Sequence, residues 1–264
     1  MRATLIFPRR KANLMKALPQ PLLRSAFFVF SFLATAWSSA GDLLEGVTAG
    51  SFYDVEKEVP WRYLLYLPAD YDVDREEAWP LFIWLHGRSL RGTDLERVKR
   101  YGPPSILKKK VDFPFVTVCP QLPDGGWPPK ALGRLLDELL ADYNVDFDRV
   151  YLSGTSLGAM GAWSFAAAYP ERFAALATVC AHGPLSSADR LTELPIRAFH
   201  GAKDKIVPMG PHQQLIDAIN DKGGNATIKI FPDGDHGSVI GPVYNDPELY
   251  EWFASQRRIP QESK

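Results

Sequence analysis

Cysteine is scarce in this chain. Only Cys119 and Cys180 occur among 264 residues. Neither has the spacing of a set of metal ligands, so no metal site is predicted. The two thiols could form a disulfide only in an oxidising compartment, and only if the fold brings their Cα atoms within about 7 Å of each other.

A surplus of basic residues is also absent. The chain has a net charge of −1 with histidine neutral. The first 40 residues hold six of the 30 basic residues and no acid, so the remainder has 24 basic against 31 acidic residues and a net charge of −7. A surface that binds nucleic acid is therefore not expected. The run Lys108-Lys109-Lys110 is predicted to be a solvated helix end.

No apolar run reaches the roughly 20 residues that a membrane-spanning helix needs. A shorter run, Ala26 to Trp37, follows a basic segment and ends in Ser38-Ser39-Ala40, which resembles a secretory signal peptide. We predict a signal peptide over residues 1–40 and a single domain over 41–264, in a secreted or periplasmic protein with no stable membrane span after cleavage. An uncleaved membrane anchor is the alternative, and Met15 is a second candidate start.

Short apolar runs alternate with segments that can form helices. Val47 to Val55 and Trp61 to Leu67 are predicted to open the fold as an antiparallel hairpin. The continuous apolar run Pro80 to Leu85 is typical of a strand buried on both faces, at the centre of a sheet. Further strands are predicted at 115–119, 150–152, 176–179, 196–199 and 227–231, and helices at 94–101, 130–143, 156–169, 211–221 and 246–256. The alternation predicts an α/β fold with a mostly parallel, twisted sheet and helices on both faces.

A Gly-x-Ser-x-Gly motif follows the strand predicted at 150–152 and precedes a helical pattern rich in small residues. Its residues are Gly154, Ser156 and Gly158. Strand, motif and helix in this order predict a nucleophile elbow, the tight turn that presents a catalytic serine in α/β-hydrolases. The glycines let strand and helix approach closely. The Leu157 N–H, free at the helix N-terminus, is predicted to meet an oxyanion.

The predicted topology separates the two cysteines. In an α/β-hydrolase sheet, the strands that end at Cys119 and Cys180 lie three positions apart, or about 14 Å at ~4.8 Å per strand. A disulfide cannot span that distance. Both are predicted to be buried free thiols.

Ser156 needs a base to activate its hydroxyl and an acid to orient that base. In the hydrolase fold the chain order is serine, acid, histidine. Asp204 and His236 each follow a later predicted strand, so their loops reach the same sheet edge as Ser156. We predict Ser156 as nucleophile, His236 as general base and Asp204 as the orienting acid. Asp233 and Asp235 are alternative acids, although a side chain that close in sequence to the histidine usually points elsewhere.

Other histidines compete for the role of base. His182 follows a strand and is the strongest alternative. His86 and His200 each precede a glycine at a strand end, where an imidazole is expected to hydrogen-bond to loop backbone. His212 begins a predicted helix and is expected at the surface.

The second oxyanion donor should come from the loop after the strand that ends at Leu85. The Arg88 N–H is our candidate and that of Ser89 the alternative, and the Arg88 side chain could also bind a substrate carboxylate. Trp127 is predicted either to wall an apolar acyl or aromatic site or to pack against the domain. About sixteen residues separate the strands that end near 179 and begin near 196, too few for a bulky lid.

Several short motifs extend the pattern beyond the elbow. They are His86-Gly87, Arg91-Gly92-Thr93-Asp94, Tyr101-Gly102-Pro103-Pro104, Pro120-Gln121, Gly126-Trp127, the segment Ser153 to Trp163, Tyr169-Pro170-Glu171-Arg172-Phe173, His200-Gly201-Ala202-Lys203-Asp204 and Asp235-His236. In order and spacing, over roughly residues 60 to 258, they resemble the α/β-hydrolase group of predicted secreted peptidases, polyhydroxybutyrate-depolymerase-like esterases and dienelactone-hydrolase-like proteins. The resemblance implies the same triad of Ser156, Asp204 and His236.

Two positions depart from that pattern. Ser89-Leu90 stands where such relatives often carry Gly-Glu, and Ala159 stands where a second glycine is common. The sequence predicts a serine hydrolase of the carboxylesterase type that needs no metal or cofactor and acts on a small-molecule or polymeric ester. A peptidase of the same fold and a catalytically silent binding protein are the alternatives.

Overall fold

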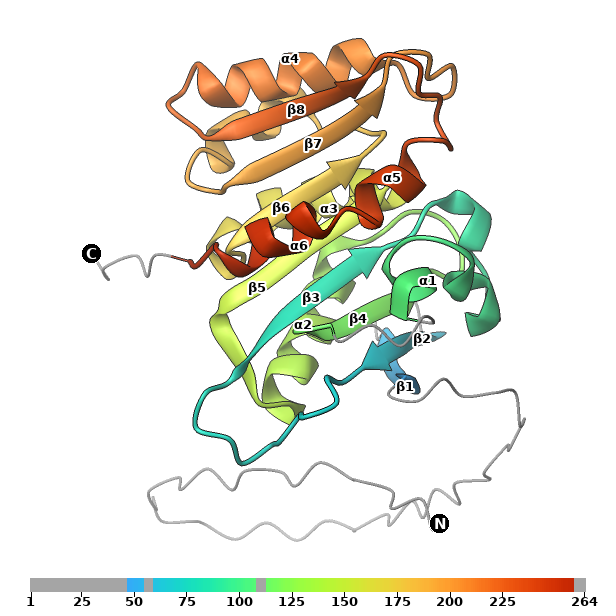
Figure 1. The fold of residues 1–264 in the computed structure, drawn as a ribbon, viewed down its shortest axis with the longest axis vertical. Coiled ribbons are helices and arrows are strands. Elements are labelled where there is room, and N and C mark those ends of the chain that lie inside the picture. The colour runs from blue at the N-terminus through green and yellow to red at the C-terminus, as the bar shows by residue number, and fades with distance from the viewer. Residues whose placement is uncertain (1–46, 55–58, 108–112, 259–264) are drawn as a thin grey trace, which may run out of the picture. The chain divides into compact units, whose positions relative to one another are not determined.

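The computed structural model describes residues 47–54, 59–107 and 113–258. The predicted signal peptide and the run Lys108-Lys109-Lys110 lie outside these residues. Within them, eight strands form one sheet in the order β1-β2-β4-β3-β5-β6-β7-β8 (Figure 1). The strands are β1 (Val47–Asp54), β2 (Val59–Tyr66), β3 (Trp79–Leu85), β4 (Val116–Gln121), β5 (Val145–Thr155), β6 (Ala175–Val179), β7 (Ile196–Gly201) and β8 (Ala226–Phe231).

Strand direction follows from how the strands are connected. From β3 to β8, neighbouring strands are parallel. β2 is antiparallel to both of its neighbours, β1 and β4, and its register pairs Phe52 with Trp61. Parallel neighbours need a crossover, usually a helix, whereas an antiparallel pair can be joined by a short turn. The predicted fold class, a mostly parallel sheet with helices, is confirmed.

Helices lie on both faces of this sheet (Figure 1). The longer ones are α2 (Pro129–Asp142), α3 (Leu157–Ala168), α4 (Met209–Asn220) and α6 (Pro247–Ala254), and the short ones are η1 (Arg88–Leu90), η2 (Leu95–Arg100), α1 (Pro103–Leu107), η3 (Pro170–Arg172), η4 (Leu185–Arg190) and α5 (Ile240–Tyr244). Among the residues described, none of these helices has the length and apolar character to cross a membrane.

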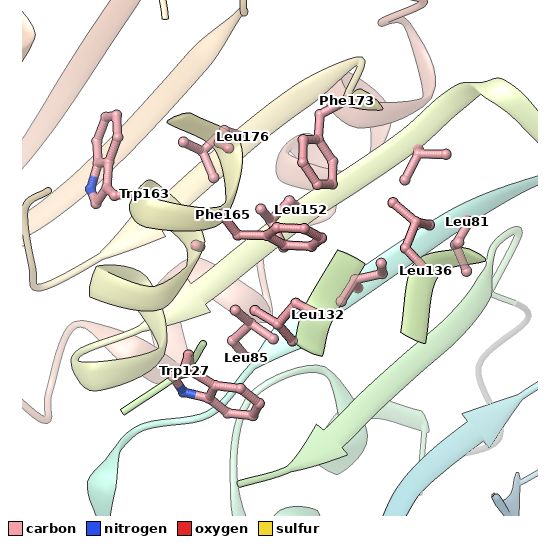
Figure 2. Close-up of a cluster of buried hydrophobic side chains, with 14 of the residues drawn as sticks. Leu81, Leu85, Trp127, Leu132, Leu136, Leu152, Trp163, Phe165, Phe173 and Leu176 are labelled. Carbon is pink, nitrogen blue, oxygen red and sulfur yellow. The ribbon is translucent and has the colours of Figure 1, made fainter. Parts of the chain in front are cut away.

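Successive residues of β3 point to opposite faces, and all seven are buried. Leu81, Ile83 and Leu85 belong to an apolar cluster shared with α2, α3 and α4, part of which is shown in Figure 2. Phe82 and Trp84 belong to a second cluster shared with α1, α5 and α6. Because both faces of β3 are covered, its sequence is a continuous apolar run.

The prediction of one helix over 94–101 is wrong in the type of helix. That segment forms the 3₁₀ helix η2, and the short helix α1 follows it. Gly102, between the two, has a φ of 71°, a conformation that glycine adopts without steric cost. Pro103 then begins α1, because a proline is tolerated in the first turn of a helix and not in its interior.

The two cysteines lie as predicted. Cys119 is on β4 and Cys180 directly follows β6, and in the sheet β3 and β5 stand between these strands. Both are buried and free of a disulfide. Burial raises the pKa of both thiols, so both remain protonated at neutral pH.

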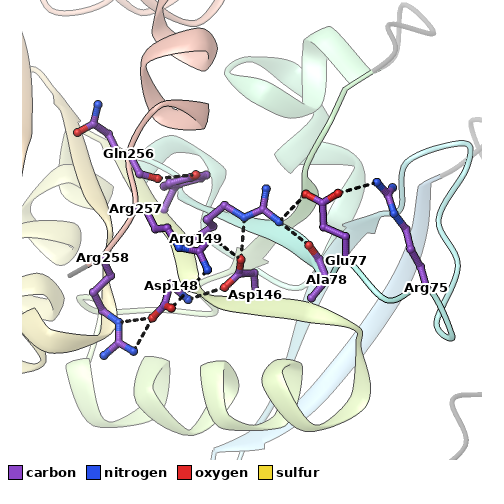
Figure 3. Close-up of polar contacts among 10 residues, drawn as sticks. Arg75, Glu77, Ala78, Asp146, Asp148, Arg149, Gln256, Arg257 and Arg258 are labelled. Atoms are coloured by element: carbon purple, nitrogen blue, oxygen red, sulfur yellow. Dashed lines mark hydrogen bonds and ion pairs between the residues drawn. The ribbon is translucent and has the colours of Figure 1, made fainter. Parts of the chain in front are cut away.

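β5 begins at Val145, before the strand predicted at 150–152. The prediction missed this first part of the strand because charged side chains interrupt the apolar pattern there. Asp146 accepts hydrogen bonds from Arg149 Nε at 2.8 Å and Arg257 Nη1 at 2.9 Å. Asp148 accepts from Arg258 Nε at 3.1 Å and Nη2 at 2.7 Å (Figure 3). The Arg258 N–H also donates to the Asp148 carbonyl. This network ties the segment after α6 to the start of β5.

Asp146 should contribute to stability in a pH-dependent way. Burial alone would raise its pKa, but hydrogen bonds from the Asp148 N–H, Arg149 and Arg257 outweigh burial, and the pKa is lowered. Such a carboxylate stabilises the fold above its unfolded pKa of about 3.9, and that contribution is lost as the pH falls through the folded pKa. Asp146→Asn should therefore lower the free energy of unfolding by about 1–3 kcal/mol at pH 7.

Urea unfolding at pH 7 and at about pH 2.5 measures this effect, and the gap between wild type and Asp146→Asn should narrow at the lower pH, where the carboxyl group begins to bind a proton in the folded state as well. Asp233→Asn is the matched control, because it removes only an exposed ion pair with Lys203 and should leave unfolding unchanged. An equal loss of unfolding free energy in both variants, or a difference between wild type and Asp146→Asn that widens in acid, would contradict the stabilising role of the Asp146 carboxylate.

Candidate active site

The turn between β5 and α3 carries Ser156. Its backbone has φ 54° and ψ −120°, a conformation that costs a non-glycine residue about 1–3 kcal/mol. A Cβ on Gly154 would lie 2.3 Å from the Gly158 carbonyl oxygen, and a Cβ on Gly158 would lie 1.9 Å from the Leu85 carbonyl oxygen. Only glycine fits at these two positions. The first turn of α3 therefore contacts the end of β3.

Three side chains from separate loops meet at this turn. His236, in the loop after β8, has Nε2 2.8 Å from Ser156 Oγ. Its Nδ1 lies 2.7 Å from Oδ2 of Asp204, in the loop after β7. Because an ionised carboxylate only accepts hydrogen bonds, Nδ1 carries the proton, and the lone pair on Nε2 faces the serine hydroxyl. In this tautomer the imidazole can act as a base toward Ser156.

Asp204 is held by its own loop as well as by the histidine. Its side chain is fully shielded from solvent, and Oδ1 accepts the N–H groups of Ile206 at 2.8 Å and Val207 at 2.9 Å. Burial by itself would raise its pKa, but these hydrogen bonds and the one from His236 dominate, so the pKa is lowered. The carboxylate is therefore ionised where it faces the imidazole.

Two of the competing histidines contact loop backbone and not Ser156. His86 is buried, its Nδ1 lies 2.7 Å from the Gly87 carbonyl oxygen and its Nε2 accepts the Leu122 N–H at 3.0 Å. Burial lowers its pKa to about 4, so it is neutral. His182 Nδ1 contacts the Gly183 carbonyl oxygen at 2.9 Å. The contacts of His86 hold the loops that follow β3 and β4.

The expectation that His212 lies at the surface is wrong. The residue is completely buried, and its ring packs edge-on against Trp163 at 6.0 Å. It shares the inward face of α4 with Leu215, Ile216 and Ile219, at the spacing of one helix face. That spacing was visible in the sequence and would have predicted burial.

A cleft of about 860 Å³ opens over Ser156. Its walls are mainly apolar, and Ile206 on its rim is 72% exposed. The lining residues are Gly87, Arg88, Ser89, Tyr101, Thr155, Ser156, Leu157, Met160, Ile206, Val207, His236, Gly237, Ile240 and Gly241. Sequence reasoning missed the apolar lining from Met160, Ile206, Val207 and Ile240, because loops and helix ends carry no periodic pattern that would reveal it.

Both predicted oxyanion donors occupy the first position of a helix. Leu157 begins α3 and Arg88 begins the 3₁₀ helix η1. The first N–H groups of a helix have no partner within it. The two segments approach closely at Ser156, since a Cβ on Gly87 would lie 3.5 Å from the Ser156 Cβ. Arg88 and Leu157 both line the cleft beside the serine.

Trp127 is not brought to this cleft. Its side chain is 5% exposed, Nε1 donates to the His86 carbonyl oxygen at 3.2 Å, and its ring packs edge-on against Trp61 at 5.7 Å. Figure 2 shows it among the buried residues near Leu85. Of the two predicted roles, the structure therefore agrees with packing against the domain. Trp127 does not form a wall of the cleft, and that prediction is corrected.

The sheet order and the elbow are those of the α/β-hydrolase fold. More specifically, residues 130–240 match the model of the dienelactone hydrolase family. A probable acetylxylan esterase A of Aspergillus fumigatus is 28% identical over 166 residues, which are 56% of this chain and 43% of that protein. A probable acetylxylan esterase A of Neosartorya fischeri is 27% identical over 171 residues. The chain thus spans less than half the length of these relatives.

Solved structures extend the likeness across the fold. A thermostable esterase superposes with a TM-score of 0.71 and 29% identity, covering 81% of this chain and 64% of that one. An S-formylglutathione hydrolase from Agrobacterium tumefaciens has a TM-score of 0.61 at 16% identity, covering 80% of this chain and 95% of that one, and supports the fold alone. The resemblance inferred from the sequence motifs is confirmed.

The elbow should not tolerate a side chain at Gly158. Gly158→Ala places a methyl group against the Leu85 backbone, so α3 must move away from β3, and we expect a loss of about 3 kcal/mol or more in unfolding free energy. Urea unfolding measures it. Gly210→Ala is the matched control, because that glycine, in the first turn of α4, has no atom within 4 Å of its built Cβ, and this variant should be as stable as wild type or slightly more stable. Equal stability of the two variants would contradict the close contact.

Proposed function

We propose that the chain is a serine hydrolase that cleaves carboxylic esters, with Ser156 as nucleophile, His236 as general base and Asp204 as the acid that orients it. The observation that carries this proposal is the continuous contact from Ser156 Oγ through His236 to Asp204, at 2.8 and 2.7 Å. A serine hydroxyl is a weak nucleophile at neutral pH and needs a base so placed.

In the proposed reaction, His236 Nε2 takes the Ser156 proton as Oγ attacks the ester carbonyl carbon. The carbonyl oxygen becomes an oxyanion, which the N–H groups of Leu157 and Arg88 stabilise. His236 then gives its proton to the leaving alkoxide, and an acyl-serine remains. A water molecule, deprotonated by the same Nε2, attacks the acyl carbon, and collapse of the second intermediate returns the proton to Ser156.

The cleft favours esters with an apolar group next to the carbonyl. Leu157, Met160 and Ile240 line it, and burying such a group against them is favourable.

The segment from β6 to β7 holds only η4 as regular structure, so no bulky cap is inserted there and a polymeric ester could reach the serine. The relatives named acetylxylan esterase support a short acyl group on a carbohydrate as a substrate. We favour esters over peptides, because amides demand stronger protonation of the leaving group.

Ser156→Ala should abolish both turnover and labelling. We expect kcat on p-nitrophenyl esters of short to medium chain length to fall by about 10⁴-fold or more, since triad members act as a unit, and a fluorophosphonate probe to label wild type only. Ser164→Ala is the matched control: it lies on α3 and its hydroxyl donates only to the Met160 carbonyl. A variant Ser156→Ala that keeps wild-type turnover would refute the nucleophile, and a folded wild type that neither labels nor turns over would favour a binding protein.

The Arg88 backbone and side chain can be separated by mutation. Arg88→Pro removes the N–H but suits the first position of a helix, and Gly87 before it is extended, with φ −74° and ψ 172°, as a residue before proline must be. We expect kcat to fall about 10²–10³-fold in Arg88→Pro, whereas Arg88→Ala should stay near wild type on uncharged esters. A loss in Arg88→Ala equal to that in Arg88→Pro would assign the function to the guanidinium instead.

A further inference from the structure

Two buried histidines lie behind Asp204 and take no part in the proposed chemistry. His200 is on β7 and His212 is on α4, and both are fully buried. His200 Nε2 lies 3.0 Å from the Val207 carbonyl oxygen and 3.2 Å from Asp204 Oδ2. Its Nδ1 lies 2.9 Å from His212 Nδ1. Asp204 Oδ2 therefore has an imidazole on each side, His236 and His200.

The neighbours of each nitrogen determine where the protons lie. Both groups near His200 Nε2, a carbonyl and a carboxylate, only accept, so Nε2 carries a proton. A neutral His200 then has its lone pair on Nδ1, and His212 Nδ1 must donate to it. His212 Nε2 in turn is free to accept from the Thr178 hydroxyl, whose oxygen is 3.3 Å away. The chain of contacts permits one arrangement of neutral tautomers.

Burial keeps these rings neutral, although the Val207 carbonyl and Asp204 raise the pKa of His200. Asp204 and His236 face His200 from the loops after β7 and β8, and His182, after β6, acts on His212. Burial is the largest influence on both rings, and it lowers the pKa of His200 and lowers that of His212 to about 3. Asp204 is the carboxylate in contact with His200 among the residues that the structure describes, and its Oδ2 faces both His236 and the Nε2–H of His200.

We propose that His200 is a positioning residue for the triad: its Nε2–H holds the Asp204 carboxylate and the Val207 carbonyl together, and His212 fixes the tautomer that makes this possible. The proposal rests on the proposed function of Ser156, His236 and Asp204. It also links the triad to substrate binding, because the loop held by His200 carries Ile206 and Val207 of the cleft wall.

Loss of the His200 Nε2–H should shift the pH profile of kcat/KM in a predictable direction. Without this donor, more of the Asp204 charge acts on His236 and stabilises its protonated form. In His200→Leu we expect the acid limb of the pH profile of kcat/KM to move up by about 0.5–1 pH unit and kcat to fall about 10- to 100-fold through misplacement of the triad, with KM on a small ester within about twofold. His200→Gln keeps an N–H donor at the same reach and should restore most of both effects.

His212 can be tested through the same readouts. His212→Leu leaves His200 without a donor to Nδ1, so we expect a smaller loss of kcat, and a double variant His200→Leu/His212→Leu no worse than His200→Leu alone. Gln214→Ala, on the exposed side of α4, controls for effects of substitution in this helix. A lowered kcat with an unmoved acid limb and no recovery in His200→Gln would overturn the proposal, as would additive losses in the double variant.

A measurement on the wild-type protein avoids any loss of folding. The chain has five histidines, so their ring nitrogens can be assigned by two-dimensional ¹⁵N–¹H NMR. Between pH 6 and 8 we expect neutral His200 with its proton on Nε2 and neutral His212 with its proton on Nδ1. A His212 proton on Nε2 would overturn the proposal. The two proposals fail in different experiments. If the proposed function is wrong, Ser156→Ala keeps wild-type turnover, whereas the NMR result depends only on the proton positions of His200 and His212.

Discussion

The contact between the first turn of α3 and the last residue of β3 is the constraint on which the site depends. A Gly158 Cβ would lie 1.9 Å from the Leu85 carbonyl oxygen, so the helix meets the strand backbone to backbone. This contact sets the height of Ser156 above the sheet. It also places the loop that begins at His86 beside the serine, because that loop starts where α3 touches β3. The nucleophile and the proposed oxyanion donors are thus positioned by one packing event.

A second constraint is the burial of the Asp204 carboxylate. A buried charge is costly unless hydrogen bonds compensate it, and Asp204 has the N–H groups of Ile206 and Val207 on one oxygen and the imidazoles of His236 and His200 near the other. These donors satisfy the charge and leave the carboxylate little freedom to rotate. The same interactions that make burial tolerable therefore also orient the base.

Much of this arrangement could be predicted from the sequence. Strong local signals identified the parallel sheet and the elbow. The apolar run of β3 is typical of a strand covered on both faces, and Gly154 and Gly158 flank a serine at a strand end. The chain order of Ser156, Asp204 and His236 then led to the three residues that the structure brings together. Each of these inferences used a pattern within about ten residues or a rule of topology.

The features that were missed depend on contacts between distant segments. His212 was expected at the surface because its place at a helix start outweighed its spacing with Leu215 and Ile219, and Trp127 was a candidate substrate wall because nothing local shows that its indole reaches the His86 carbonyl. The start of β5 was missed because Asp146 and Asp148 are paired with arginines more than a hundred residues later. Those pairs secure one end of β5, while the other end carries the strained Ser156. Strain at the elbow costs about 1–3 kcal/mol, and the close packing of Gly154 and Gly158 at that end holds the backbone of Ser156 in this conformation.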